Sequence, residues 1–183
     1  MPQNQKDDLV ITKETQVQEI IKKTASCSCD ACKNSCRFGS GFATAQDLQK
    51  IADYLHMGVD ELKKNLMEEK TFFHTTLSRP KLKRKKEHHP FGACVFFDEE
   101  KGCTIHEVKP TECKVAMPCD PIGEDTRIWF LVNHFLNPAD PISLQEYAVY
   151  LKTNGRTIPK AELHEVCKDE KIREEVLSYK RVR

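Results

Sequence analysis

Residues 27–36, CSCDACKNSC, place four cysteines within ten positions, spaced C-x-C-x2-C-x3-C. Four more follow between residues 94 and 119, spaced C-x8-C-x9-C-x5-C. A tight loop or a helix start can aim closely spaced thiolates at one metal ion, and distant thiolates can join them once the chain folds. The sequence therefore predicts metal binding by both groups. The candidate ligands are Cys27, Cys29, Cys32, Cys36, Cys94, Cys103, Cys113 and Cys119.

The composition excludes several classes of protein. The chain has 183 residues, nine of them cysteine, and its 29 Lys and Arg nearly balance its 28 Asp and Glu. It is long enough to bury a hydrophobic core without disulfide staples. It has no apolar run near the ~20 residues that span a bilayer, and its polar start, MPQNQKDDLV, is unlike a signal peptide. We therefore expect a cytoplasmic protein that keeps its cysteines as thiolates.

The choice of metal follows from ligand softness. All-thiolate sets suit zinc or iron–sulfur clusters and disfavour magnesium and calcium. The irregular spacing that ends in Pro118-Cys119 is closer to that of iron–sulfur proteins than to paired zinc knuckles. We therefore expect one or two clusters, most simply of the 4Fe-4S type, with zinc as the alternative. Eight sulfurs suffice for two four-thiolate sites, or for one cluster with other thiols nearby.

Basic side chains and one histidine accompany the cysteines. A four-thiolate cluster is negatively charged, so nearby cations would stabilise it. His106 is a candidate for tuning a cluster or replacing a ligand, and otherwise packs as an ordinary side chain. Cys167 stands apart from the other cysteines and is predicted to be a buried side chain. The candidate cations are Lys33, Arg37, Lys109 and Lys114.

Apolar periodicity predicts a mainly α fold with a small β-hairpin, forming an irregular cysteine-rich metal-binding domain followed by C-terminal helices. We divide the chain into an N-terminal helix (1–26), a cysteine-cluster domain (27–122) and a C-terminal helical extension (123–183). The first cysteine group is interpreted as a loop, and Gly58 as a left-handed helix C-cap. A further helix carries the stripe from Ile128 to Phe135. The other helices are expected to start near Thr15, Thr44, Asp60, Ser143 and Pro159.

Residues 79–90, RPKLKRKKEHHP, form a basic run without an apolar period, which predicts an exposed loop. Nucleic-acid binding is not expected, because the net charge is only +1 and the run lacks interleaved aromatic residues. Docking on an acidic protein surface is the better interpretation, and the two histidines, His88 and His89, are taken as bystanders. After this loop, 93–98 and 103–106 are expected to pair as a hairpin. The docking candidates are Lys83, Arg84, Lys85 and Lys86.

The segment 92–113, GACVFFDEEKGCTIHEVKPTEC, resembles the YkgJ-type CxxCxxCC family, described as zinc- or iron-chelating. Within the stretch 27–119, the resemblance implies a metal-binding domain and says nothing of a reaction. His106, Lys109 and Lys114 replace the family's usual Tyr, Arg and Arg. The residues that fall on the pattern are Cys94, Cys103, Ile105, Pro110, Cys113 and Pro118.

The first cysteine group departs from this family pattern. Aligning Cys29 and Cys32 with the opening C-x2-C places Ser35 and Cys36 on the family's paired cysteines. One expected ligand is therefore a serine, and Cys27 is an additional thiol that could substitute for it.

The function expected from the sequence is that of an iron–sulfur protein acting in electron transfer or in redox or oxygen sensing. It would dock as an accessory or regulatory subunit on a larger enzyme, through the basic loop or the C-terminal helices. The alternative is a structural zinc-binding adaptor without redox chemistry. A catalytic metal is disfavoured, because an all-thiolate set leaves no open position for substrate. The sequence contains no recognisable catalytic constellation.

Overall fold

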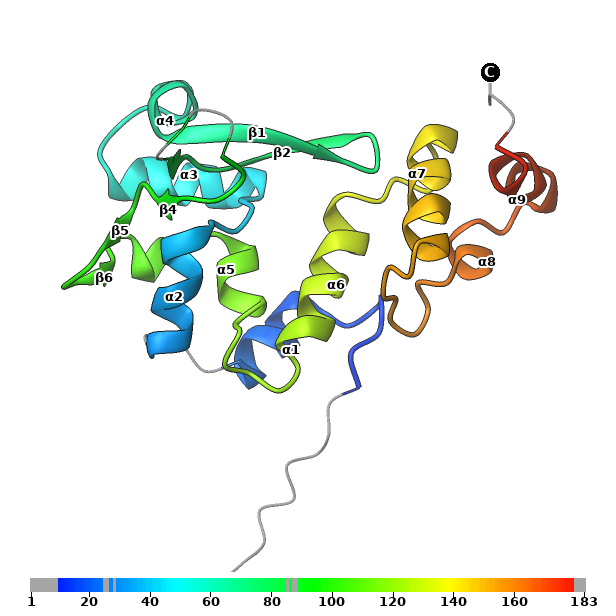
Figure 1. Cartoon of the computed structure of the whole chain (residues 1–183), viewed down its shortest axis with the longest axis horizontal. Coiled ribbons are helices and arrows are strands. Elements are labelled where there is room, and N and C mark those ends of the chain that lie inside the picture. Colours follow the sequence, from blue (N-terminus) through cyan, green and yellow to red (C-terminus); the bar gives the residue numbers. More distant parts are fainter. Residues whose placement is uncertain (1–9, 25–26, 28, 85, 87–88, 180–183) are drawn as a thin grey trace, which may run out of the picture.

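The structure is a computed structural model that describes residues 10–24, 27, 29–84, 86 and 89–179. Within these ranges it is mainly helical with small two-stranded sheets, which confirms the predicted fold class (Figure 1). The helices are α1 Val17–Lys23, α2 Asp30–Phe38, α3 Ala45–Tyr54, α4 Val59–Leu66, α5 Thr111–Val115, α6 Gly123–His134, α7 Pro141–Lys152, α8 Leu163–Val166 and α9 Glu170–Leu177. The strands are β1 Met67–Phe72, β2 Thr75–Pro80, β3 Leu82–Lys83, β4 Ala93–Cys94, β5 Phe97–Asp98 and β6 Gly102–Cys103, and a 3₁₀ helix, η1, spans His106–Val108.

The longest strands, β1 and β2, form a hairpin that the sequence analysis did not predict. They pair antiparallel from Met67 opposite Pro80 to Phe72 opposite Thr75. Phe73 and the next residue turn the chain with φ angles of 46° and 58°, a conformation that usually recruits Asn or Gly. Because most of β1 is exposed, it lacks the alternation of apolar and polar residues by which a strand is recognised.

The predicted exposed loop at 79–90 is wrong for its first part. Residues 79 and 80 belong to β2, and β3 pairs with β4. Arg79 and Arg84 both form ion pairs of 2.7 Å with the half-buried Glu68. The segment therefore continues the strands. The carboxylate of Glu68, which lies outside the basic run in the sequence, neutralises part of its positive charge.

The four residues predicted to dock on a partner differ in whether their side chains are already engaged within the chain. Arg84 is held by its ion pair, and the Lys83 Nζ atom lies 3.4 Å from the Phe97 carbonyl oxygen. Lys86 is exposed. Lys85 and the neighbouring His88 lie outside the described residues.

The predicted hairpin near residue 100 is present in a shorter form. β5 and β6 pair with Phe97 opposite Cys103 and Asp98 opposite Gly102. Residues 93 and 94 instead form β4, which pairs with β3. The Asp98 carboxylate accepts the N–H groups of the next turn, at Glu100 and Lys101, which fixes the reversal of the chain.

The second half of the first cysteine group, with Cys32 and Cys36, lies in α2, which corrects the loop prediction for that part. Cys29 is the N-cap of α2, and Asp30 places a negative charge at its N-terminus. Thr44 caps α3 at the predicted start, and Asp47 completes its capping box. Gly58 is not a left-handed C-cap: its φ is −73°, and it is the N-cap of α4.

Other predicted helix ends differ in detail. The first helix, α1, is capped by Gln16 with Glu19, so it starts one residue after the predicted Thr15. Asp140 caps α7, whereas Ser143 is buried and its hydroxyl oxygen accepts a hydrogen bond from the Asn137 N–H. The final charged segment breaks into α8 and α9. The buried Cys167 lies between these helices, which agrees with its prediction as a buried side chain.

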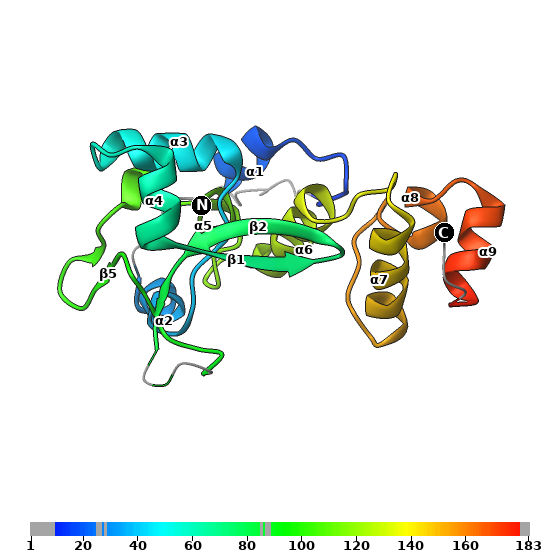
Figure 2. The same ribbon diagram turned by 90° about the horizontal axis from the view of Figure 1, so that it is seen from above.

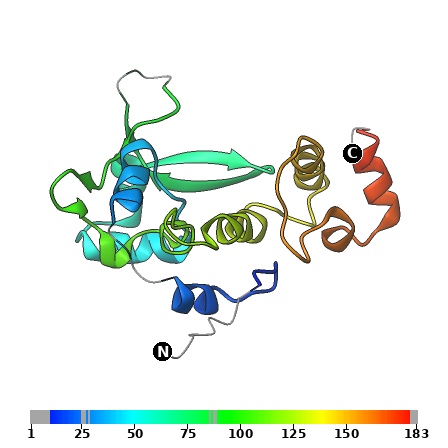
Figure 3. The same cartoon turned by 60° about the horizontal axis from the view of Figure 1, so that its bottom comes forward.

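Two hydrophobic clusters hold these elements together. One gathers the α6, α7 and C-terminal side chains with Ile20 of α1, and the other packs α3 and α4 against the short strands. Figures 2 and 3 show the β1–β2 hairpin reaching from the cysteine-rich end to α7. At its tip, the Phe73 ring packs 5.2 Å from that of Tyr147, centroid to centroid. In the described part of the chain, no helix is long and apolar enough to cross a membrane.

Candidate metal centre

Four cysteines converge at the N-terminus of α2. The sulfur atoms of Cys27, Cys29, Cys32 and Cys119 all lie within 4.8 Å of one another, and we call these residues the tight set. Cys29 caps α2, Cys32 lies in its first turn, and Cys119 arrives from the turn after α5. The helix start therefore presents closely spaced thiols, and a residue distant in sequence completes the group.

The tight set fits a single metal ion. Zinc binds thiolates at about 2.3 Å in a tetrahedron, which places the sulfurs roughly 3.8 Å apart. The sulfurs of Cys32 and Cys119 are already 3.4 Å apart. The other pairs need at most a small contraction to reach this geometry.

The tight set also stabilises negative charge. The Cys32 backbone N–H and the Cys27 thiol lower the pKa of the Cys29 thiol to about 7. Burial raises the pKa of Cys32, and its neighbouring thiols raise it further. The start of the helix thus favours the thiolate form of Cys29, and a bound cation would favour release of protons from the other thiols.

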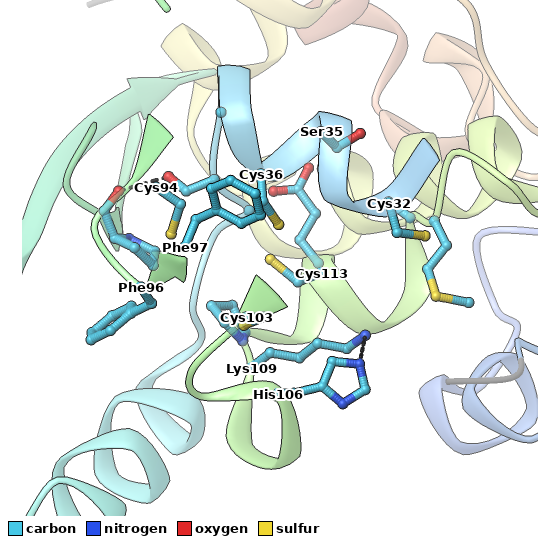
Figure 4. A pocket seen from close by; sticks show the side chains of 18 of the residues that line it. Cys32, Ser35, Cys36, Cys94, Phe96, Phe97, Cys103, His106, Lys109 and Cys113 are labelled. Atoms are coloured by element: carbon cyan, nitrogen blue, oxygen red, sulfur yellow. Dashed lines mark hydrogen bonds between the residues drawn. The ribbon is translucent and has the colours of Figure 1, made fainter. Parts of the chain in front are cut away.

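A second set of four cysteines lies farther along α2. Cys36 of α2, Cys94 of β4, Cys103 of β6 and Cys113 of α5 line a cavity of about 330 Å³, and we call these residues the wide set. Figure 4 shows the sulfurs of Cys36, Cys94 and Cys113 turned toward a common space, with Cys103 beneath. Each of the four comes from a different element.

The wide set is more buried than the tight set. Cys94 is buried and the other three are half-buried. Burial raises the pKa of Cys94 to about 12 and that of Cys113 well above its ordinary value, and the proximity of Cys36 raises both further. The thiols therefore lie close enough to repel one another as anions, in an environment that disfavours uncompensated charge.

The two sets divide the cysteines differently from the two groups in the sequence. Cys36 leaves the first sequence group to join the wide set, and Cys119 leaves the second to join the tight set. Ser35, which takes a family cysteine position, is exposed and borders the same cavity, and Figure 4 shows its side chain pointing away from Cys36 and Cys113. The additional Cys27 lies in the tight set.

Lys109 and His106 lie beside both sets. The Lys109 Nζ atom is 3.5 Å from the His106 Nε2 atom, which in turn is 3.4 Å from the Cys27 carbonyl oxygen (Figure 4). Lys109 is only 8% exposed, and its charge lowers the pKa of Cys36 and Cys103 against the effect of burial. This lysine is thus suited to compensate thiolates of the wide set.

The other three predicted cations are less suited than Lys109 to compensate the charge of thiolates. The Arg37 guanidinium forms an ion pair with Glu99 at 2.9 Å and lies over the Phe97 ring. Lys33 lines the cavity. Lys114 is half-buried and contributes its carbonyl oxygen to a hydrogen bond from the Thr24 hydroxyl.

Three residues that the sequence analysis did not connect with the cysteines position Cys113. The Asp47 carboxylate accepts hydrogen bonds of 2.9 Å from both the backbone N–H and the hydroxyl of Thr111, which ties α5 to α3. A Cβ at Gly41 would lie 2.6 Å from the Cys113 sulfur, so only glycine allows this approach. The pattern Gly39-Ser40-Gly41 was the one signal of this contact in the sequence.

A helical scaffold with small sheets and converging thiols defines a cysteine-cluster metal-binding domain. The model of the CxxCxxCC family, described as a "putative zinc- or iron-chelating domain", matches residues 28–129. The chain belongs to this family, which confirms the resemblance seen in its sequence. No curated protein and no solved structure matches the chain.

Proposed function

We propose that the chain is a zinc-binding protein in which a single ion, held by the tight set, fixes the start of α2 to the turn after α5. The observation that carries this proposal is the spacing of the four sulfurs, all within 4.8 Å of one another. A four-iron cluster would place each thiolate on a separate iron, which requires more widely spaced sulfurs. Zinc is preferred to a single ferrous ion because it binds such sites more tightly.

The packing of α2 supports a structural role for this ion. None of the nine residues of α2 is fully buried, and the helix meets the second hydrophobic cluster through the half-buried Cys36 and through Arg37, which lies over the Phe97 ring. Structural zinc supplies about 10–16 kcal/mol in small domains at neutral pH, and this energy is coupled to folding. Zinc at the N-terminus of α2 would therefore supplement this limited hydrophobic contact.

The ligand set supports an adaptor rather than an enzyme. Four thiolates fill a tetrahedral zinc site and leave no position for water or substrate. The ion then stabilises the fold and does not take part in a reaction. Electron transfer, oxygen sensing and docking on a larger enzyme stay predictions for the chain.

Metal analysis of matched cysteine variants tests this proposal. Cys119→Ser removes one thiolate of the tight set, whereas Cys167→Ser removes a thiol that lies in a hydrophobic cluster. After purification without oxygen, we expect one zinc per chain in the parent and in Cys167→Ser, and loss of that zinc in Cys119→Ser. A parent protein without zinc, or a Cys119→Ser variant that retains it, would contradict the proposal.

A further inference from the structure

We propose that the C-terminal end of α2 and the adjoining basic segment bind an acidic segment of another protein. The residues that carry this inference are Phe38, Lys83, Lys86 and Phe91, and we call them the docking surface. None of them is a thiol, so the inference goes beyond the zinc site and does not depend on it. It rests on two exposed phenylalanines, on the backbone that holds them and on the charge beside them.

Two large aromatic side chains are exposed on neighbouring segments. Phe38, the last residue of α2, is 57% exposed, and Phe91 is 58% exposed. A hydrogen bond of 3.3 Å from the Gly92 N–H to the Phe38 carbonyl oxygen joins the two segments. Single exposed apolar residues are common on protein surfaces, whereas aromatic residues that lie together form a site to which a partner can bind.

Hydrogen bonds fix the segment that carries Phe91. The Arg84 Nε atom donates to the His89 carbonyl oxygen at 2.9 Å, and the same guanidinium pairs with Glu68. The His89 Nδ1 atom in turn lies 2.9 Å from the Phe91 carbonyl oxygen. At the base of the segment, β3 pairs with β4. Because this backbone is already ordered, a partner that binds Phe91 loses less entropy in fixing it.

The charge beside the phenylalanines is positive. Residues 79–90 contain six Lys or Arg side chains and one Glu. In the described part of the chain, the ion pairs of this run use one carboxylate, that of Glu68, which is shared by two arginines. Lys83 and Lys86 are exposed and form neither of these ion pairs. The remaining positive charge is complementary to Asp and Glu side chains of a partner.

A polypeptide fits this surface better than a nucleic acid does. Single-stranded nucleic acid binds in a basic groove that follows several phosphates. Here the positive charge is confined to one short segment, and the net charge of the chain is only +1. Protein interfaces combine a few aromatic anchors with a charged rim, which is the composition of this surface. In Figure 2, α2 and the chain that follows β2 lie at the edge of the molecule opposite α3.

Selection from a display library of random short peptides tests the inference, with the anaerobically purified chain as bait. The affinity of synthetic copies of the enriched peptides is then measured by fluorescence anisotropy. We expect these peptides to carry a net negative charge and at least one leucine, phenylalanine or tryptophan. Their affinity should fall as the salt concentration rises, because salt screens exposed charges.

Two double variants locate the binding site on the chain. Phe38→Ala combined with Phe91→Ala should weaken peptide binding about tenfold or more, because buried aromatic anchors carry much of the energy of an interface. Lys83→Glu combined with Lys86→Glu should weaken binding by a similar factor and should reduce its dependence on salt. The two variants change the surface by different chemistry, so if one does not fold, as judged by far-ultraviolet circular dichroism, the other decides.

Substitutions elsewhere on the surface provide the controls. Leu177→Ala removes an apolar side chain that is 51% exposed, and Lys50→Glu combined with Lys63→Glu changes the net charge as much as the lysine variant does. Both controls are expected to keep the parent affinity. All these variants should keep the parent zinc content, since none alters a thiol. A parent protein without zinc would therefore contradict the zinc proposal and leave this inference standing.

Four results would overturn the inference. Enrichment of no peptide, or of peptides without net negative charge, would contradict an acidic partner. Equal affinity of the phenylalanine variant and the Leu177→Ala control would place binding elsewhere. Tighter binding of single-stranded oligouridylate than of any peptide, weakened by the same variants, would assign the surface to nucleic acid. A parent dimer in light scattering that the phenylalanine variant converts to a monomer would assign the surface to a second copy of this chain.

Discussion

Cys32 and Cys36 lie one turn apart on the same face of α2 and belong to different thiol sets. The Cys32 sulfur lies 3.4 Å from that of Cys119, whereas Cys36 turns toward Cys94 and Cys113 (Figure 4). A regular helix is needed to present both thiols, because an irregular loop would not fix their separation. One short helix thus carries thiols of both sets, and we expect its stability to depend on metal.

Removal of metal is expected to release α2 before the rest of the fold. Because α2 has no fully buried residue, chelation should increase amide hydrogen exchange across 29–38 much more than in α7, which buries Leu144 and Tyr147. Hydrogen exchange with and without a chelator measures this difference. Equal protection of α2 in the two states would show that metal does not hold the helix.

Ser35→Cys is expected to leave metal content unchanged. It restores the paired cysteines of the family pattern, but the Ser35 side chain is exposed and points away from the wide set. It is also expected not to rescue zinc binding when it is combined with Cys27→Ser. Rescue in the double variant, measured by metal analysis, would place residue 35 rather than residue 27 in the zinc site.

Gly41→Ala is expected to displace Cys113. The added methyl group would lie 2.6 Å from the Cys113 sulfur and 3.0 Å from its backbone nitrogen, and overpacking of this kind costs about 1–3 kcal/mol. We expect a lower melting temperature. Gly58→Ala is the matched control, because no atom lies within 4 Å of the Cβ position there. Equal melting temperatures of the two variants would contradict the proposed contact.

The ion pairs of Glu68 are expected to give an acid-sensitive contribution to stability. Hydrogen bonds from Arg84 and Arg79 lower the pKa of Glu68 to about 2, from 4.5. Because the folded-state pKa is lowered, the contribution is fully present above pH 4.5 and is lost as the pH falls toward 2. Glu68→Gln should lower the unfolding free energy by about 2–3 kcal/mol at neutral pH.

Glu69→Gln provides the control for that measurement, because Glu69 is the exposed neighbour on the same strand. Denaturant unfolding of both variants at several pH values gives the comparison. The difference between them should shrink as the pH falls below 4.5. A difference that is independent of pH would assign the effect to packing rather than to charge.

Local sequence signals were sufficient for part of the fold. The capping box of Thr44 with Asp47 and the reversal after Asp98 depend on side chains within a few residues, so both can be inferred from the sequence. The β1–β2 hairpin depends on pairing between largely exposed strands, and the basic segment depends on the distant Glu68. Such contacts leave no periodic pattern in the sequence. For this reason the β1–β2 hairpin was not predicted, and the basic segment 79–90 was predicted as a loop.

In the candidate site, too, local sequence signals predicted one part and distant contacts decide the other. Residue type and spacing predicted eight candidate ligands, but the partition of these thiols between sets depends on the helical conformation of α2 and on the turn that carries Cys119. The close contact of Gly41 with Cys113 and the burial of Lys109 arise only through tertiary packing. The sequence therefore predicted the chemistry of the donors and left open how they assemble.

X-ray absorption at the zinc edge of the anaerobically purified protein tests most directly whether the tight set holds a single zinc ion. We predict zinc with four sulfur neighbours at about 2.3 Å and no metal neighbour. Zinc with nitrogen or oxygen ligands, or a protein that contains no zinc, would contradict the account.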